Sequence, residues 1–181
     1  MNNRKKLSFK VALGGVIAAL SLLLMLAAGV TTSLVYAIPM ITGAFLMVLV
    51  IEFGAGFAGL EYLAISIISM LLLGNKEAAI MYVAFFGYYP IIKSFIERHL
   101  GKLFGWIIKY IIFNISMVAA YFVVSKIFMI TFDDMEMFGK YAMLVLLAAG
   151  NALFVLYDIM LTRLVTIYIY KWQKYIKRMF K

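Results

Sequence analysis

The sequence predicts an all-α membrane protein, a polytopic helical bundle of six transmembrane helices with both termini in the cytoplasm. Three observations predict this fold class. Of the 181 residues, 66% are hydrophobic and 14% are charged, with a mean hydropathy of +1.04. Apolar runs long enough to cross a bilayer recur along the chain, and most lysines and arginines gather in alternate segments between these runs.

The composition restricts the partners and the chemistry of the protein. A soluble domain is about half apolar and about a quarter charged, so this chain is too apolar for a water-soluble core. Its 17 Lys and Arg against 8 acidic residues predict contact with a lipid bilayer whose inner leaflet is anionic, and no contact with nucleic acid. Cysteine is absent and His99 is the single histidine, so we expect no disulfide, metal site or cofactor.

The hydropathy pattern divides the chain into six spans. A bilayer core about 30 Å thick needs about 20 residues of helix. The first apolar run follows a basic start, as in a signal peptide, but further spans follow, so we expect it to be retained. No linker divides the chain, which predicts a single integral-membrane domain over residues 1–181. The predicted spans are 11–30, 34–53, 57–73, 78–96, 104–130 and 138–168.

The distribution of basic residues predicts the orientation, because short cytoplasmic loops carry an excess of Lys and Arg. Basic residues gather before the first span, around the loop between spans four and five, and after the sixth span. The loop between spans five and six instead holds Asp133, Asp134 and Glu136. We therefore expect a multi-pass protein of the cell (plasma) membrane with its N- and C-termini inside.

The tail from about residue 169 alternates basic residues with Tyr, Trp172 and Phe180. This pattern is typical of a basic amphipathic helix that lies in the headgroup layer. A topogenic anchor explains the tail more simply than a regulatory lipid-binding role, because the same basic residues orient the last span.

Polar side chains inside the predicted spans are candidates for function, because such groups are costly at membrane depth. Asn114 and Asn151 lie at comparable depth on spans five and six, where they either join the two helices by a hydrogen bond or contact a ligand. Lys93 and Asp158 lie in the cytoplasmic halves of spans four and six. We expect an ion pair between them that holds these spans together; the alternative is a proton or cation site.

Pro90 is expected to bend the fourth span. Proline removes the backbone bond to the carbonyl of Phe86, and Gly87 in the same turn makes bending easier. The bend would tilt the cytoplasmic part of the span, which carries Lys93. It either shapes a cytoplasmic contact surface or is a packing kink with no moving part.

The first span carries small residues at helical spacing. Gly14 and Ala18 are four residues apart, as are Gly15 and Ala19, so both pairs allow another backbone to approach closely. We expect these four residues to form a helix–helix interface. The partner helix belongs either to this chain or to a different protein.

Three features together resemble a known architecture. They are the basic start followed by VALGGVIAALSLLLML, the loop and Pro39 in TTSLVYAIPMITGAF, and the count of six spans. These features resemble the S components of energy-coupling-factor vitamin transporters, which are small substrate-binding membrane subunits of bacteria. In that family a first-helix motif of two alanines, three residues apart, docks on a transmembrane coupling protein. Here the small pairs in the first span are four residues apart.

The resemblance implies a pocket that opens outward, lined by the first external loop and the outer ends of spans four to six. It implies that a small, vitamin-like ligand contacts Thr31, Thr32, Tyr36, Tyr82 and Asn151. It also implies that the small residues of the first span contact a coupling protein that works with ATPase subunits. An apolar pocket with aromatic rings and a few polar groups suits such a ligand.

Two functions remain open from the sequence. The first is a non-enzymatic, small-solute binding subunit of a multi-protein ATP-driven importer, which depends on separate ATPases because this chain has no nucleotide-binding motif. The alternative is a non-transport structural or regulatory membrane protein of the bacterial envelope or sporulation machinery. An autonomous transporter is disfavoured because no internal repeat is present, and an enzyme because no positioned catalytic groups are recognisable.

Overall fold

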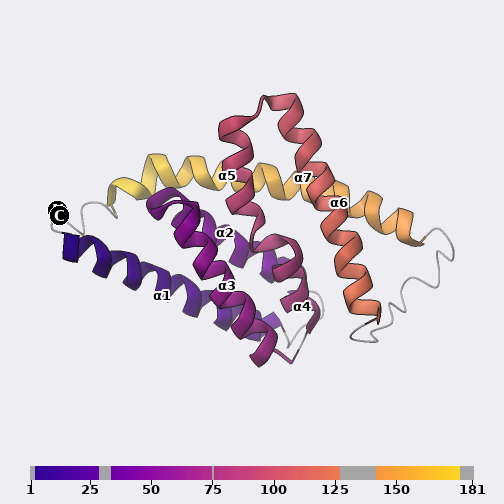
Figure 1. Cartoon of the computed structure of the whole chain (residues 1–181), viewed down its shortest axis with the longest axis horizontal. Helices are drawn as coiled ribbons and strands as arrows, with labels where there is room; N and C mark the ends of the chain where they lie inside the picture. The colour runs from indigo at the N-terminus through magenta and orange to yellow at the C-terminus, as the bar shows by residue number, and fades with distance from the viewer. Residues whose placement is uncertain (1–2, 29–33, 75, 127–141, 176–181) are drawn as a thin grey trace.

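Helices make up almost all of the chain that the structure describes. The computed structural model describes residues 3–28, 34–74, 76–126 and 142–175, and the all-α prediction is confirmed for them. Figure 1 shows the helices, of which η2 and η4 are π-helical turns. In chain order they are α1 (Asn3–Ala28), α2 (Ala37–Phe53), α3 (Ala55–Leu72), α4 (Lys76–Met81), η2 (Tyr82–Phe86), α5 (Tyr89–His99), α6 (Lys102–Lys126), α7 (Ala142–Ile167) and η4 (Tyr168–Trp172).

These helices suit a multi-pass membrane protein. α2, the predicted second span, has 17 residues and a length of about 26 Å, slightly less than a hydrocarbon core about 30 Å thick. Five helices are long and apolar enough to cross a bilayer, and α2 is a shorter apolar helix, so five to six spans stand beside the six predicted. The five longer stretches are Leu7–Ala28, Ala55–Leu72, Lys76–His99, Lys102–Val123 and Leu147–Tyr175.

Most helix ends differ from the predicted span ends by a few residues, and α1 begins eight residues early, at Asn3; two further differences are informative. α2 begins at Ala37 instead of residue 34, because Pro39 has no N–H and is tolerated only in the first helical turn. At the other end of the chain, the helix does not stop at residue 168 but continues through η4 to Tyr175. Residues 127–130 and 138–141, which the sequence assigns to spans five and six, lie outside the described residues.

The continuation of α7 is tied to the end of α2. The carboxylate of Glu52 accepts hydrogen bonds from the Tyr168 hydroxyl, at 3.1 Å, and from the Gln173 side-chain amide, at 3.0 Å. The first part of the predicted basic tail is thus held against the bundle as a direct extension of α7. Residues 176–181 lie outside the described residues.

α2 lies at the centre of the bundle. It packs against α1, α3, η2, α5 and α7. The other long helices expose large apolar side chains, for example Leu23, Leu71, Ile115 and Leu156. An apolar exterior of this kind is the expected contact surface for lipid tails, because such side chains are as apolar as the tails themselves.

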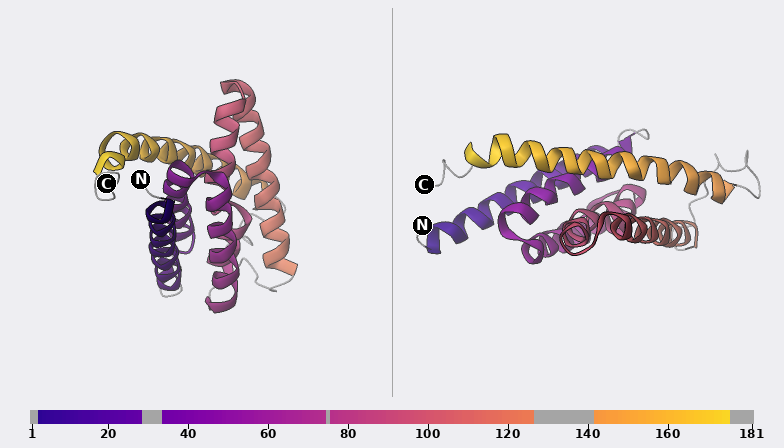
Figure 2. Two further views of the ribbon diagram at one scale, coloured as in Figure 1. Left: turned by 60° about the vertical axis from the view of Figure 1, so that its left-hand side comes forward. Right: turned by 90° about the horizontal axis from the view of Figure 1, so that it is seen from above.

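The two described ends of the chain lie on the same side of the molecule. The start of α1 and the end of η4 both lie at the left of Figure 1, and again at the left of the right-hand view in Figure 2. An even number of crossings returns a chain to the side on which it began. The arrangement therefore fits six spans.

The fourth span is interrupted where the sequence predicts a bend. η2 ends at Phe86, and α5 begins at Tyr89 with Pro90 in its first turn. Pro90 has no N–H, so the Phe86 carbonyl lacks its helical donor. The Tyr157 hydroxyl on α7 donates to that carbonyl over 3.5 Å, and Gly43 on α2 packs directly against it. The interruption thus provides a contact point for two other helices.

The π-turn frees a second carbonyl in the same span. The Gly87 N–H donates to the Tyr82 carbonyl at 2.8 Å, whereas in an α-helix it would donate to Val83. The Val83 carbonyl instead accepts a hydrogen bond of 2.8 Å from the Tyr62 hydroxyl on α3. A side chain from a neighbouring helix therefore satisfies a polar group that would be costly to leave unpaired in a membrane.

Candidate functional site

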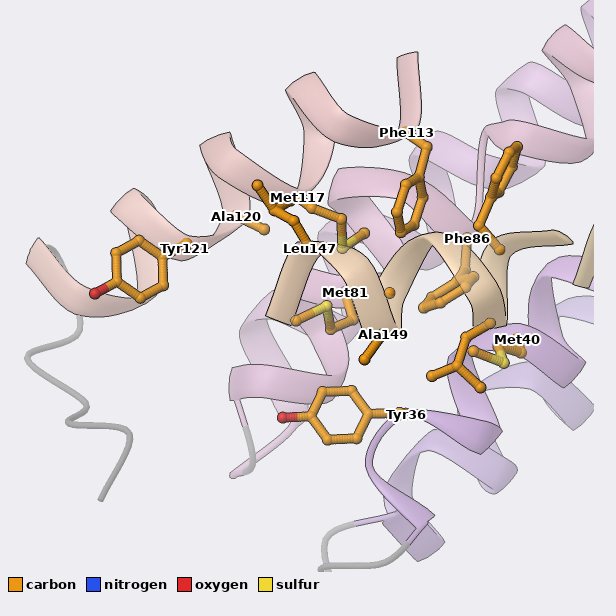
Figure 3. A pocket seen from close by; sticks show the side chains of 13 residues that line it. Tyr36, Met40, Met81, Phe86, Phe113, Met117, Ala120, Tyr121, Leu147 and Ala149 are labelled. Atoms are coloured by element: carbon orange, nitrogen blue, oxygen red, sulfur yellow. The ribbon is translucent and has the colours of Figure 1, made fainter. Parts of the chain in front are cut away.

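A cavity of about 250 Å³ lies between α2, the α4–η2 segment, α6 and α7. It is near the helix ends that the predicted topology places outside: Tyr36 precedes α2, Met81 ends α4, and Tyr121 lies in the last part of α6. Figure 3 shows the side chains of the thirteen residues that line it. None of them is charged.

Aromatic rings form a large part of the cavity wall. The rings of Phe113 and Phe154 stack with their centroids 4.8 Å apart and their planes at 17°. The ring of Phe86 meets that of Tyr157 edge-on at 5.2 Å. Gly150 leaves room beside Phe113, because a Cβ there would lie only 3.3 Å from that ring. These contacts fix the orientation of the three phenylalanines that face the cavity.

The rest of the wall is apolar and adaptable, apart from two tyrosines. The hydroxyls of Tyr36 and Tyr121 are the only polar side-chain groups among the lining residues. Methionine adapts its shape to its surroundings because it is unbranched and polarisable. Three methionines line the cavity: Met40, Met81 and Met117.

Only some of the residues that were predicted to contact a ligand line the cavity. Tyr36 lines the cavity. Tyr82 does not, because its ring is buried against α3, and its neighbour Met81 faces the cavity instead. The Tyr82 hydroxyl has no hydrogen-bond partner within the described part of the chain. Thr31 and Thr32 lie outside the described residues.

Asn151 is paired with Asn114 and is not part of the cavity wall. Each side-chain amide donates to the carbonyl oxygen of the other at 3.0 Å. Each also donates to its own helix, Asn114 to the carbonyl of Tyr110 and Asn151 to that of Leu147. The two asparagines thus join α6 to α7, which is the first of the two roles the sequence left open.

Four charged side chains meet in the other half of the bundle. Lys93 and Glu97 come from α5, Lys109 from α6 and Asp158 from α7. The Lys93 ammonium lies 2.5 Å from Glu97 and 2.7 Å from Asp158. The Lys109 ammonium lies 2.6 Å from Glu97 and 3.1 Å from Asp158. Each lysine contacts both acids, so these four residues form a closed ring of alternating charge, the charge cluster.

The charge cluster is neutral overall, and three of its four side chains are buried. The side chains of Lys93, Asp158 and Lys109 are 1%, 4% and 5% exposed, whereas that of Glu97 is 45% exposed. The Tyr89 hydroxyl adds a hydrogen bond of 2.5 Å to Asp158. Pairing of this kind is what allows charged groups to remain in a low-dielectric interior. The predicted contact of Lys93 with Asp158 is therefore present as part of a larger network.

Sequence reasoning missed Tyr89, Glu97 and Lys109 as members of this network. A signal was available, because Tyr89, Lys93 and Glu97 are four residues apart and share one helix face. Lys109 also stood out as a charge inside an apolar run. The sequence could not show that these residues converge, because convergence depends on how α5, α6 and α7 pack.

The charge cluster joins three helices through ion pairs. Both carboxylate oxygens of Asp158 accept hydrogen bonds, one of them from Tyr89, Lys93 and Lys109. This arrangement favours the ion-pair interpretation over an open cation site. In the described part of the chain, no group of three His, Asp or Glu side chains could hold a metal ion.

The small residues of α1 divide between two faces. Gly14 is buried, and a Cβ there would meet the side chain of Glu61 on α3. Ala18 packs against the core. Gly15 and Ala19 are exposed, and a Cβ at Gly15 would have nothing within 4 Å. The first pair therefore lies against the rest of the chain, and the second is left on the outer surface.

Comparisons with known proteins found no relative. No protein-family model matches the chain, no curated protein matches it, and no solved structure matches it. The functional interpretation therefore depends on the cavity, the charge cluster and the outer surface of α1.

Proposed function

We infer that this chain is a membrane-embedded, non-enzymatic subunit that binds a small solute for a multi-protein ATP-driven importer, in the manner of an S component. The observation that carries this proposal is the cavity of about 250 Å³. A concave, mostly apolar space with a few polar groups is the usual form of a small-molecule site. Its place near the predicted outer ends of α2, α6 and α7 suits a solute that arrives from outside the cell.

Other features of the chain support a subunit that works with partners. Gly15 and Ala19 leave a strip on the outer face of α1 that another transmembrane helix can approach closely. The charge cluster holds α5, α6 and α7 together at the end of the bundle away from the cavity. The energy for transport would come from separate ATPase subunits, because the chain has no nucleotide-binding motif.

Co-purification tests the proposal. The tagged protein is purified in mild detergent from its native host, and its partners are identified by mass spectrometry. We expect a transmembrane coupling protein together with two ATPases. Recovery of the chain alone, or with envelope-assembly proteins, while a control importer stays intact, would contradict the proposal and favour the structural or regulatory alternative.

Two substitutions of the same kind locate the interface. Gly15→Leu places a large side chain on the exposed strip of α1, so we expect the partners to be lost while the protein still folds. Gly59→Leu on α3 is the matched control, since a Cβ at Gly59 would also have nothing within 4 Å. If both variants lose the partners, or if neither does, the strip at Gly15 and Ala19 is not the partner interface.

A further inference from the structure

The cavity wall suits an uncharged ligand. None of the thirteen lining residues carries a charge, and the hydroxyls of Tyr36 and Tyr121 are the only polar side-chain groups. A charged ligand would lose its hydration in this space without an opposite charge to pair with, which is costly. Lys93 and Lys109 do not supply such a charge, because each is already bound to two carboxylates outside the cavity wall.

The wall also suits a planar ligand. Phe86, Phe113 and Phe154 present rings that are held by aromatic contacts with residues outside the wall, Phe85 and Tyr157. Aromatic rings gain free energy from stacked or edge-to-face contact with another ring, beyond the burial of area. The methionines fill irregular space around such a ligand without demanding one shape.

The volume limits the size of the ligand. A cavity of about 150 Å³ binds benzene, so the 250 Å³ available here holds about ten non-hydrogen atoms. One aromatic ring with substituents, or two fused rings, has this size. The acyl chain of a membrane lipid has more carbon atoms than this space holds, so it is a poorer occupant.

We propose that the cavity binds an uncharged aromatic molecule of one substituted ring or two fused rings. The ligand lies against Phe86 and the stacked pair of Phe113 and Phe154. This inference rests on the proposed function, because it names the chemical class of the solute that the same cavity takes.

The test measures thermal unfolding of the full chain in lipid nanodiscs with three probes of similar size. They are 2-naphthol, which is uncharged and aromatic, 2-naphthoate, which adds a negative charge, and n-decanol, which mimics an acyl chain. We expect 2-naphthol to raise the unfolding temperature in a saturable way. The other two probes are expected to leave it unchanged at the same concentration.

Substitutions at two neighbouring alanines provide a variant with a blocked cavity and its matched control. Ala149 lines the cavity, whereas its neighbour Ala148 is not part of the wall, although both are exposed. Ala149→Phe places a ring in the cavity, so we expect the affinity for 2-naphthol to fall at least tenfold. Ala148→Phe adds the same ring outside the cavity and is expected to keep the wild-type affinity.

Each remaining outcome contradicts the inference in a recognisable way. If 2-naphthoate or n-decanol stabilises the protein as much as 2-naphthol or more, and Ala149→Phe abolishes this effect, the proposed ligand class is wrong. The cavity would still be a small-molecule binding site. Stabilisation by 2-naphthol that survives in Ala149→Phe would place the probe elsewhere. No effect of any probe would also overturn the inference. The co-purification of ATPase subunits is independent of these probes, so it decides separately whether the importer proposal stands.

Discussion

Asp158 shows how a buried charge is kept at membrane depth. Its carboxylate receives hydrogen bonds from Tyr89, Lys93 and Lys109, and its side chain is 4% exposed. Buried ion pairs contribute little net stability, because the cost of desolvation offsets their attraction. Removing Asp158 is different, since Lys93 and Lys109 would then share the single carboxylate of Glu97 and the cluster would keep a net positive charge in a low-dielectric interior.

We therefore expect Asp158→Asn to lower the free energy of unfolding by about 3–5 kcal/mol. Combining Lys93→Met with Asp158→Asn should recover much of this loss, because Lys109 and Glu97 remain paired at 2.6 Å and the cluster stays neutral. Thermal unfolding of the four members of this double-mutant cycle, in detergent, measures both effects. A well-folded Asp158→Asn protein that has lost only solute uptake would support a functional charge instead.

Two buried tyrosines are expected to respond in opposite ways to loss of the hydroxyl. Tyr89→Phe removes the hydrogen bond to Asp158, so we expect a loss of about 1.5–3 kcal/mol of stability. Tyr82→Phe removes a buried hydroxyl that has no partner among the described residues, so the change should be neutral or stabilising by up to about 1 kcal/mol. The two variants are compared by thermal unfolding under identical conditions. A large loss in Tyr82→Phe would mean that its hydroxyl contacts a ligand or another polar group.

At the scale of elements, the interrupted fourth span organises its neighbours. The carbonyl that Pro90 frees faces Gly43 on α2 and the Tyr157 hydroxyl on α7. The carbonyl that the π-turn frees receives the Tyr62 hydroxyl from α3. An unbroken α-helix would use these carbonyls itself, so the interruption is the reason that α3 and α7 donate hydrogen bonds to them, while α2 packs closely against one of them.

The close approach of α2 to this span gives a prediction about glycine. A Cβ at Gly43 would collide with the backbone oxygen of Phe86, so Gly43→Ala should lower stability by about 1–3 kcal/mol. Gly59→Ala is the control, because it lies inside α3 with open space around it and should gain about 0.5–1 kcal/mol. Denaturation curves of the two variants should move in opposite directions. Equal effects would argue against the tight contact at Gly43.

At the scale of the whole molecule, the two halves of the bundle differ in chemistry. One half holds an uncharged cavity walled by rings and methionines, and the other holds the charge cluster. Phe154 connects them, because it lines the cavity and its ring lies 5.4 Å from that of Tyr89, which binds Asp158. The charge cluster is thus connected to the wall of the cavity through Tyr89 and Phe154.

The orientation of the whole chain is open to direct measurement. The sequence contains no cysteine, so a single introduced cysteine reports its own location. Gly74 and Gly101 are exposed, in the connections before α4 and before α6. We expect an impermeant thiol reagent on intact cells to label Gly74→Cys, and to label Gly101→Cys only after permeabilisation. The reverse pattern would invert the topology that the basic residues predict.

Much of the fold could be predicted because a bilayer imposes simple requirements on a chain. A span must have a minimum apolar length and must satisfy its backbone groups within a helix. Composition and hydropathy reveal which segments meet these two requirements, so they predict the all-α class and the approximate spans. The interruption at Pro90 also followed, because a missing N–H is a local property of the residue.

The cavity wall could not be predicted, because it depends on which face of each helix turns inward. The π-turn adds one residue to the fourth span, which rotates the following side chains by about 100°. At the start of that turn Tyr82 packs against α3, while Met81 before it faces the cavity. Asn151 satisfies its amide with Asn114 and does not reach the cavity. The local sequence alone determined the helices and their approximate ends. Packing between segments that are distant in the sequence determined which side chains surround the cavity and which charged groups form ion pairs.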